Sequence, residues 1–235
     1  VWGEQGVGDE IMFASCFEEL ARSCKELTVS VSSRLVPIME RSFSNNIRFI
    51  DRHLPLGDEE FDVQVPVLTA VGHLRQNLES FSSCNAPYIS ADQSKVKILR
   101  DELEKYSNGK KIVGLSWFSK NATVGKRRSI NLVELVSALP DDFFLVNLQY
   151  GGIANDIQAV EKQLKRGIAS FDNVDIWNDI DTFLALIEAC DKVVSVDNST
   201  VHFAGALNKK CHVLLPYGSD WRWGLTGDKS SYWYG

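Results

Sequence analysis

The stretch from Lys192 to Leu207 constrains the fold more than any other part of the chain. Its β-branched run, Val193–Val196, is typical of a buried strand, and the helix-capping residues Asp197–Thr200 end that strand. A helix that begins near Ser199 and carries the small residues Ala204–Ala206 can pack closely on a sheet. Its first backbone N–H groups favour an anion such as a diphosphate. An ordinary strand-to-helix turn fits this stretch equally well.

The overall charge argues against large polyanionic partners. The 235 residues include 25 Lys and Arg against 31 Asp and Glu, which gives a formal net charge of −6. We therefore expect neither nucleic acid nor an anionic membrane surface as a partner, and any anion site must be local. No apolar run approaches the roughly 20 residues of a transmembrane span.

Cysteine usage indicates a reducing compartment. The number of cysteines is odd and no Cys-x-x-Cys pair occurs, so neither a disulfide framework nor a zinc site is expected, and a cytoplasmic location is predicted. The five are Cys16, Cys24, Cys84, Cys190 and Cys211.

Both ends of the sequence are abrupt. Val1-Trp2-Gly3 lacks an initiator Met and reaches a glycine turn after two strand-like residues, and the aromatic cluster Tyr232–Gly235 is followed by nothing. The chain is expected to be a fragment of a longer protein, truncated at both ends. The terminal aromatic residues suit either glycan binding or core surface bared by the truncation.

A glycine-rich loop opens the chain. Gly3–Asp9 runs into apolar residues at helical spacing between Ile11 and Leu20, so a strand, a loop and a helix follow one another. The spacing of Gly3, Gly6 and Gly8 departs from the dinucleotide fingerprint Gly-x-Gly-x-x-Gly. The loop lets a ligand approach the backbone closely beside Asp9. The alternative role for the Asp9 side chain is to cap the following helix.

Strands and helices alternate on both sides of a Ser-, Asn- and Pro-rich linker at 80–92. This order predicts two open α/β halves with parallel sheets, 1–92 and 93–235. Expected strands are 27–31, 47–50, 61–65, 111–117, 143–149, 174–176, 193–196 and 211–215, and expected helices are 34–43, 68–78, 93–106, 132–139, 157–164, 182–190 and one from about 199.

Ligands of open parallel sheets bind beyond the carboxyl ends of the strands. The glycine loop, the Asp197 turn and a basic loop at 118–129 all lie at such ends. The basic loop holds the densest positive cluster of the chain, which includes Lys126 and Arg128.

Several motifs occur in a characteristic order: Gly6-Val-Gly-Asp9, Arg128-Ser129, Leu148-Gln149, Asp197–Thr200 with His202 and Ala204–Leu207, and Leu215-Pro216 with Asp220-Trp-Arg-Trp223. Together they resemble the glycosyltransferase domain of bacterial tetratricopeptide-repeat proteins, which is related to lipopolysaccharide heptosyltransferases and distantly to protein O-GlcNAc transferases. The resemblance spans almost the whole chain. It implies a GT-B fold, with two Rossmann-like halves facing a cleft, an acceptor-side N-terminal half and tetratricopeptide repeats upstream of Val1.

The resemblance also implies a mechanism. Asp9, on an acceptor-side loop with Gly6 and Gly8, corresponds to a general base that takes the proton of an acceptor hydroxyl. Arg128, with Lys126 second, corresponds to the basic residue that contacts the donor diphosphate. The acceptor class is open: a glycan, a lipid-linked molecule or a protein.

Further roles follow from the same resemblance. Asn198, Ser199 and Thr200 are expected to hold the diphosphate, and His202 to face the donor sugar or phosphate unless it is a core or capping residue. Asp197 is expected to brace the turn or bind a sugar hydroxyl. Base and ribose are expected near Gln149, Tyr150 and Asp175, with plain packing as the alternative for Tyr150.

No metal or cofactor is expected. Asp179-Ile180-Asp181 mimics the Asp-x-Asp of metal-dependent glycosyltransferases, but it precedes a predicted helix, so capping explains it better. The leading hypothesis is a metal-independent inverting glycosyltransferase that uses a nucleotide-diphospho-sugar. The alternatives are a non-catalytic nucleotide- or sugar-binding module of a larger repeat protein, and a sugar-nucleotide epimerase or hydrolase.

Overall fold

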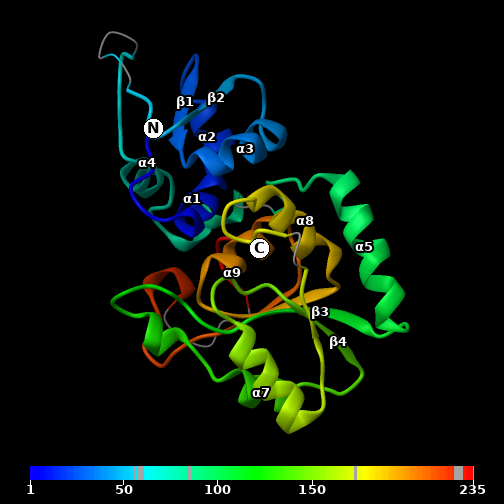
Figure 1. Ribbon diagram of the computed structural model, residues 1–235. Helices are drawn as coiled ribbons and strands as arrows, with labels where there is room; N and C mark the ends of the chain where they lie inside the picture. The colour runs from blue at the N-terminus through cyan, green and yellow to red at the C-terminus, as the bar shows by residue number, and fades with distance from the viewer. Residues whose placement is uncertain (56, 58–60, 84–85, 172–173, 225–229, 235) are drawn as a thin grey trace. The chain divides into compact units, whose positions relative to one another are not determined.

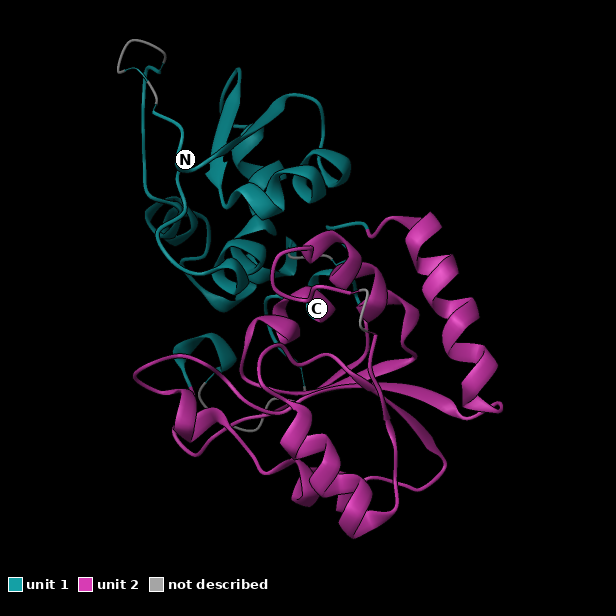
Figure 2. Cartoon of the chain, in the orientation of Figure 1, with its two compact units in different colours: residues 1–90, 205–208, 220–235 teal, residues 91–204, 209–219 magenta. Residues whose placement is uncertain are grey.

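The computed structural model describes residues 1–235 except 56, 58–60, 84–85, 172–173, 225–229 and 235. The chain divides into two compact units, which Figure 2 shows in different colours. Unit 1 comprises Val1–Ser90, Gly205–Asn208 and Asp220–Gly235, and unit 2 comprises Ala91–Ala204 and Lys209–Ser219. Two segments that the sequence assigns to the C-terminal half, 205–208 and the described residues of 220–234, therefore belong to the same unit as the N-terminal residues.

Unit 1 contains a small parallel sheet. Strands β1 (Leu27–Val31) and β2 (Ile47–Asp51) pair in parallel, and Trp2 forms single parallel bridges to Ser30 and Pro66. Trp2 therefore lies where a third strand would lie, with the glycine loop at its carboxyl end. Around the sheet lie α1 (Val7–Ala14), α2 (Phe17–Ala21), α3 (Val36–Ser42), α4 (Val67–Leu74), η1 (Ser33–Leu35), η3 (Leu78–Ser83) and η5 (Trp221–Trp223).

The first helix is interrupted, although its apolar spacing predicts one continuous helix. The amides of Ser15 and Cys16 bond the carbonyls of Met12 and Phe13, three residues back, and the Ser15 hydroxyl also donates to Met12 at 2.8 Å. These tight turns end α1, and α2 begins at Phe17. Apolar side chains of both pieces are buried in the core of unit 1.

The predicted strand at 61–65 is wrong. Trp2 occupies the edge of β1, and its amide nitrogen donates to the Val65 carbonyl at 3.3 Å while Val67 donates back to Trp2 at 2.9 Å. This pairing makes one bridge, at Pro66, and the side chain of Val63 stays 81% exposed. A strand with one face buried needs more partners than this segment has.

Unit 2 contains a five-stranded parallel sheet in the order β5-β4-β3-β6-β7. Its strands are β3 (Lys111–Ser116), β4 (Phe143–Asn147), β5 (Ile168–Ala169), β6 (Lys192–Val196) and β7 (Cys211–Leu214), and its helices are α5 (Gln93–Ser107), α6 (Leu132–Ser137), α7 (Ala154–Leu164), α8 (Ile180–Ala189), the greater part of α9 (Ser199–Ala206) and η4 (Gly125–Arg128). The α/β class with parallel sheets is confirmed.

Helices cover both faces of this sheet. Helix α5 packs with α8, whereas α6 packs with α7, and Figure 1 shows α7 and α8 on opposite sides of β3 and β4. One core cluster joins Val113, Leu115 and Leu145 of the sheet to Leu135 of α6 and Val160 of α7. The strand order reverses between β3 and β6, so this doubly wound sheet has its switch point there.

Capping residues set the helix starts of unit 2. Asp92 accepts from the amides of Ser94 and Lys95 to begin α5, and Asp179 accepts from the Thr182 amide at 2.9 Å to begin α8. The left-handed conformation of Asn108, with φ of 51°, ends α5. These starts and ends of α5 and α8 therefore lie where the capping residues in the sequence predict them.

The predicted strand at 174–176 is also wrong. The Asp175 carboxylate accepts from the amides of Trp177 and Asn178, at 3.0 and 2.9 Å, and folds this segment into a turn. The strand beside β4 is instead the short β5, which pairs with Leu145 and Val146. Within the described ranges, no helix is both long and apolar enough to cross a membrane.

Candidate functional site

The glycine loop of unit 1 places Asp9 in the first turn of α1. Gly6 is the N-cap, and its carbonyl accepts from the amides of Asp9 and Glu10 at 3.0 and 3.1 Å. The capping alternative for Asp9 is therefore excluded. A Cβ at Gly6 would lie 3.9 Å from Asp9 Oδ2, an ordinary contact, and Gly8 lies within α1.

Asp9 forms an ion pair with a residue from the far end of the chain. Arg222 Nη1 donates to Asp9 Oδ1 at 2.7 Å, and the two side chains are 11% and 16% exposed. The Gln5 amide, oriented with its nitrogen toward Asp9, lies 3.3 Å from both carboxylate oxygens. Arg222 is not among the site residues that the sequence predicts, although it stands out as a lone cation between two tryptophans of the Asp220–Trp223 motif.

The neighbouring carboxyl, Glu10, faces the interior of unit 1. It is 2% exposed, forms an ion pair with Arg52 and accepts from the Ser32 amide at 3.1 Å. Burial raises the pKa of Glu10 to about 7, against the lowering effects of Arg52 and Ser32. A Cβ at Gly3 would lie 2.5 Å from Glu10 Oε1, so this glycine leaves space for Glu10.

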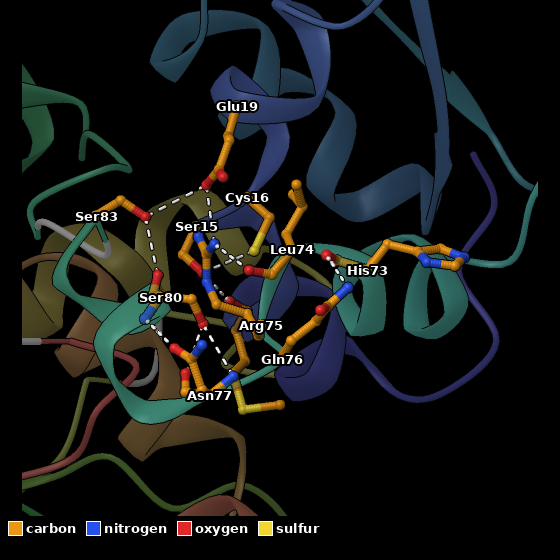
Figure 3. Close-up of polar contacts among 11 residues, drawn as sticks. Ser15, Cys16, Glu19, His73, Leu74, Arg75, Gln76, Asn77, Ser80 and Ser83 are labelled. Atoms are coloured by element: carbon orange, nitrogen blue, oxygen red, sulfur yellow. Dashed lines mark hydrogen bonds and ion pairs between the residues drawn. The ribbon is translucent and has the colours of Figure 1, made fainter.

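A second buried arginine of unit 1 serves packing (Figure 3). Arg75 Nη1 donates to Glu19 Oε2 at 2.9 Å, and its guanidinium lies 5.9 Å from the centroid of the Phe81 ring. Ser83 donates to the same Glu19 oxygen at 3.3 Å, which ties η3 to α2. Figure 3 also shows the imidazole of the exposed His73 pointing away from this cluster.

In unit 2, Asn198 joins the ends of β3 and β6 at the switch point. Its Nδ2 donates to Ser116 Oγ at 2.7 Å and to the Phe118 carbonyl at 3.1 Å. Its Oδ1 accepts from the Thr200 amide at 3.0 Å, so Asn198 also satisfies a donor at the start of α9. Asn198 therefore fixes the turn at which the sequence predicts diphosphate binding.

Gln149 stabilises the same strand ends from the other side. Its side-chain oxygen accepts from the Ser116 hydroxyl at 2.9 Å and from the amides of Trp117 and Phe118, each at 3.0 Å. The residue is 1% exposed. These contacts give Gln149 a buried bracing position in the region that the sequence predicts for base and ribose.

Arg128 and Asp197 form the ion pair of unit 2. Arg128 Nε lies 3.0 Å from Asp197 Oδ2, and the two side chains are 16% and 1% exposed. Arg128 ends η4, in a loop ordered by Asn121 and Ser129: Asn121 Oδ1 accepts two amides at 3.0 Å, and Ser129 Oγ donates to Gly125 at 2.7 Å. The buried Asp197 thus holds the arginine that the sequence predicts as the diphosphate ligand.

The other predicted donor residues differ in exposure. Lys126 is exposed on η4, Ser199 is half-buried at the first position of α9, and Thr200 and His202 are 1% and 2% exposed. The Thr200 hydroxyl lies 3.4 Å from Ser116 Oγ. The structure thus brings Arg128, Asp197, Asn198 and Ser199 to one end of the unit 2 sheet.

Tyr150 and Asp175 border a separate aromatic patch of unit 2. The Tyr150 ring lies 4.9 Å from that of Trp177, which is 51% exposed, and Lys120 Nζ lies 5.3 Å from the Tyr150 centroid. Burial raises the pKa of Tyr150, and the Asn178 hydrogen bonds lower the pKa of Asp175. Gly151, at φ of 105°, leaves space for Lys120.

The Asp-x-Asp sequence is engaged in helix capping and an ion pair. Asp179 caps α8, and Asp181 accepts from Lys95 Nζ at 2.9 Å. Among the residues that the structure describes, no group of three His, Cys, Asp or Glu side chains is placed to hold a metal ion. Cys16 and Cys190 are buried, Cys24 is exposed, Cys211 is half-buried, and Cys84 lies outside the described residues.

Comparison of the sequence with known proteins finds a curated relative. No family model matches the chain. The protein FlbA of Caulobacter vibrioides is 30% identical over 249 aligned positions, which cover 98% of this chain and 41% of FlbA. The chain thus spans less than half the length of that relative.

Solved structures with a similar fold are glycosyltransferases. ADP-heptose lipopolysaccharide heptosyltransferase II of E. coli superposes with a TM-score of 0.53 over 90% of this chain and 82% of its own, and a glycosyl transferase family 9 protein of Veillonella parvula with 0.57 over 90% and 79%. NodZ α-1,6-fucosyltransferase, soaked with GDP-fucose, superposes with 0.52 over 87% and 90%. Each is 12% identical to this chain. The chain therefore has the α/β fold with parallel sheets of the GT-B glycosyltransferases.

Proposed function

We propose that this chain is a glycosyltransferase domain that transfers a sugar from a nucleotide-diphospho-sugar to a hydroxyl group, with inversion and without a metal ion. The observation that carries the proposal is the position of Arg128 beside the start of α9, at the switch point of the unit 2 sheet. Ligands of doubly wound sheets bind at such points.

The donor site is assigned to unit 2 on chemical grounds. A departing diphosphate gains negative charge, which a guanidinium and a helix start stabilise. Asp197 fixes Arg128, and Asn198 fixes the turn into α9. Lys126 and Ser199 add an exposed cation and a hydroxyl within the same two segments. Asp179 and Asp181 are engaged elsewhere, which favours charge stabilisation by Arg128 over a bound metal.

Asp9 is the proposed general base. Its carboxylate accepts the proton of the acceptor hydroxyl while that oxygen forms a bond to the anomeric carbon of the donor sugar. The bond from that carbon to the diphosphate breaks, and the nucleoside diphosphate leaves with the electron pair. Displacement in one step from the opposite face inverts the anomeric centre. A glycan, a lipid-linked molecule or a protein supplies the hydroxyl, and the parent protein carries tetratricopeptide repeats.

The first experiment identifies the donor. Thermal unfolding in the presence of UDP-, ADP- and GDP-sugars should show a rise in Tm with one of them. Arg128→Gln should remove most of that rise, because the diphosphate loses its charge-assisted hydrogen bonds. No rise with any of the three sugars would contradict the donor assignment.

The second experiment tests the base. With the donor so identified, Asp9→Asn should lower kcat by about 10²- to 10⁴-fold, the usual contribution of a general base, while the Kd for the nucleoside diphosphate changes less than about twofold. Asp62→Asn, an exposed aspartate of the same unit, is the matched control. Equal kcat in Asp9→Asn and in the parent chain would rule out the assigned base.

A second candidate function is a non-catalytic sugar-nucleotide-binding module. The pairing of Asp9 with Arg222 favours it, because an engaged carboxylate also suits a purely structural role. Nucleotide binding by the parent chain without transfer to any tested acceptor, and without donor hydrolysis, would select this function.

A further inference from the structure

The segment 220–223 brings an arginine to the proposed base. We propose that Arg222 is a positioning residue for Asp9, holding its carboxylate in one orientation toward the acceptor hydroxyl. This inference rests on the proposed function, in which Asp9 is the base. Arg222 lies 213 positions from Asp9 in the sequence, yet the two side chains meet within unit 1.

The contact is short and largely shielded from water. Arg222 Nη1 lies 2.7 Å from Asp9 Oδ1, and Arg222 Nε lies 3.4 Å from Asp220 Oδ1. With only 11% and 16% of the two side chains exposed, solvent screening is weaker than at a surface pair. Two carboxylates therefore hold the guanidinium in place, and only Asp9 lies on the glycine loop–helix element.

Aromatic packing anchors this segment to the helix that carries Asp9. The Trp221 ring lies 6.1 Å from that of Trp233, and Trp233 meets Phe13 edge-on at 5.8 Å. Phe13 follows Asp9 by four residues on α1, so both lie on the same face of that helix. The segment therefore contacts α1 directly through the Arg222–Asp9 ion pair and, one turn further along the helix, indirectly through Trp233.

This arrangement defines what Arg222 contributes. Arginine keeps its charge at every working pH and presents a planar fork that fixes the orientation of a carboxylate. The bond from Arg222 is to Oδ1, so Oδ2 is the carboxylate oxygen that Arg222 leaves for the acceptor, and the Gln5 amide lies 3.3 Å from both oxygens. The adjacent Glu10 is 2% exposed, so of the two carboxylates on this turn Asp9 is the accessible one.

The test separates positioning from stability. Arg222→Gln should lower kcat about 100-fold, because a base displaced by an ångström costs about that factor, while the acceptor KM and the nucleoside diphosphate Kd change less than about threefold. In Arg222→Ala, added guanidinium ion should restore part of kcat. Arg75→Gln is the matched control, since Arg75 pairs with Glu19 in the same unit: it should lower Tm and leave kcat unchanged.

Each outcome bears on one claim. If Arg222→Gln keeps kcat within about threefold while Asp9→Asn abolishes transfer, Arg222 does not position Asp9, and the proposed function stands. If Asp9→Asn also keeps kcat, the proposed function fails first. If Arg222→Gln does not fold, Arg222→Lys keeps the charge without the fork: a kcat lowered about tenfold supports positioning, and an unchanged kcat overturns it.

Discussion

The Asp9–Arg222 pair of unit 1 and the Asp197–Arg128 pair of unit 2 join the same two chemical groups in different settings. In unit 1 both side chains keep some exposure, 16% for Asp9 and 11% for Arg222. In unit 2 the aspartate is buried at 1% and the arginine is 16% exposed. The more accessible partner is the one that can meet a substrate. The comparison therefore supports the proposal that the carboxylate acts on substrate in unit 1 and the guanidinium does so in unit 2.

The two pairs also differ in what holds them. Polar contacts fix the strand ends beside Asp197, through Asn198 and Gln149. Aromatic contacts fix the segment of Arg222, through Trp221 and Trp233. Hydrogen bonds between strand ends depend on local geometry, whereas the aromatic anchor depends on packing between distant parts of the chain. The two sites should therefore fail under different substitutions.

The largest expected effect is at Trp233. This side chain is 3% exposed and packs edge-on against Phe13 and Phe81, so Trp233→Ala should lower the free energy of unfolding by about 4 kcal/mol. Denaturant titration measures this change. Trp177→Ala, which removes a half-exposed indole in unit 2, should cost less than about 1 kcal/mol. Similar losses in the two variants would show that the aromatic anchor is not a core element.

The next effect distinguishes the two ion pairs. Asp197→Asn should cost about 3 kcal/mol of unfolding free energy, because it removes the buried partner of Arg128. Asp9→Asn, where Arg222 retains Asp220 and both side chains reach water, should cost about 1 kcal/mol. Urea unfolding of both variants under one condition gives the comparison. A larger loss of unfolding free energy in Asp9→Asn than in Asp197→Asn would contradict the view that Asp197 is the structural carboxylate and Asp9 the accessible one.

The smallest effect is a pH dependence within unit 1. Burial raises the pKa of Glu10 from 4.5 to about 7, so between these values the folded state keeps a proton that the unfolded chain has released. Stability is therefore lost as pH rises, by roughly 2 kcal/mol between pH 5 and 7 from this group. Glu10→Gln should lack that decline in Tm, while Glu26→Gln, at an exposed position, should retain it. If Tm changes with pH in the same way in the parent chain and in Glu10→Gln, the pKa of Glu10 is not raised in the folded state.

Local signals predicted much of the fold. The valine run of β6 and the capping residues after it gave the start of α9 at Ser199, and Asp179 begins α8 as a cap. Such features depend on neighbours within a few residues, which the sequence displays directly. The strands predicted at 61–65 and 174–176 failed because Trp2 and Asp175 supply competing partners for those segments.

The sequence by itself determined the α/β class, the position of the glycine loop before α1 and the residue types at the strand ends. Only the tertiary structure decided that Asp197 holds Arg128, that Gln149 is buried as a brace, and that Arg222 meets Asp9. These pairings join residues 31 to 213 positions apart. No local pattern encodes which distant side chains a folded core will bring within hydrogen-bonding distance, because that choice depends on how whole elements pack.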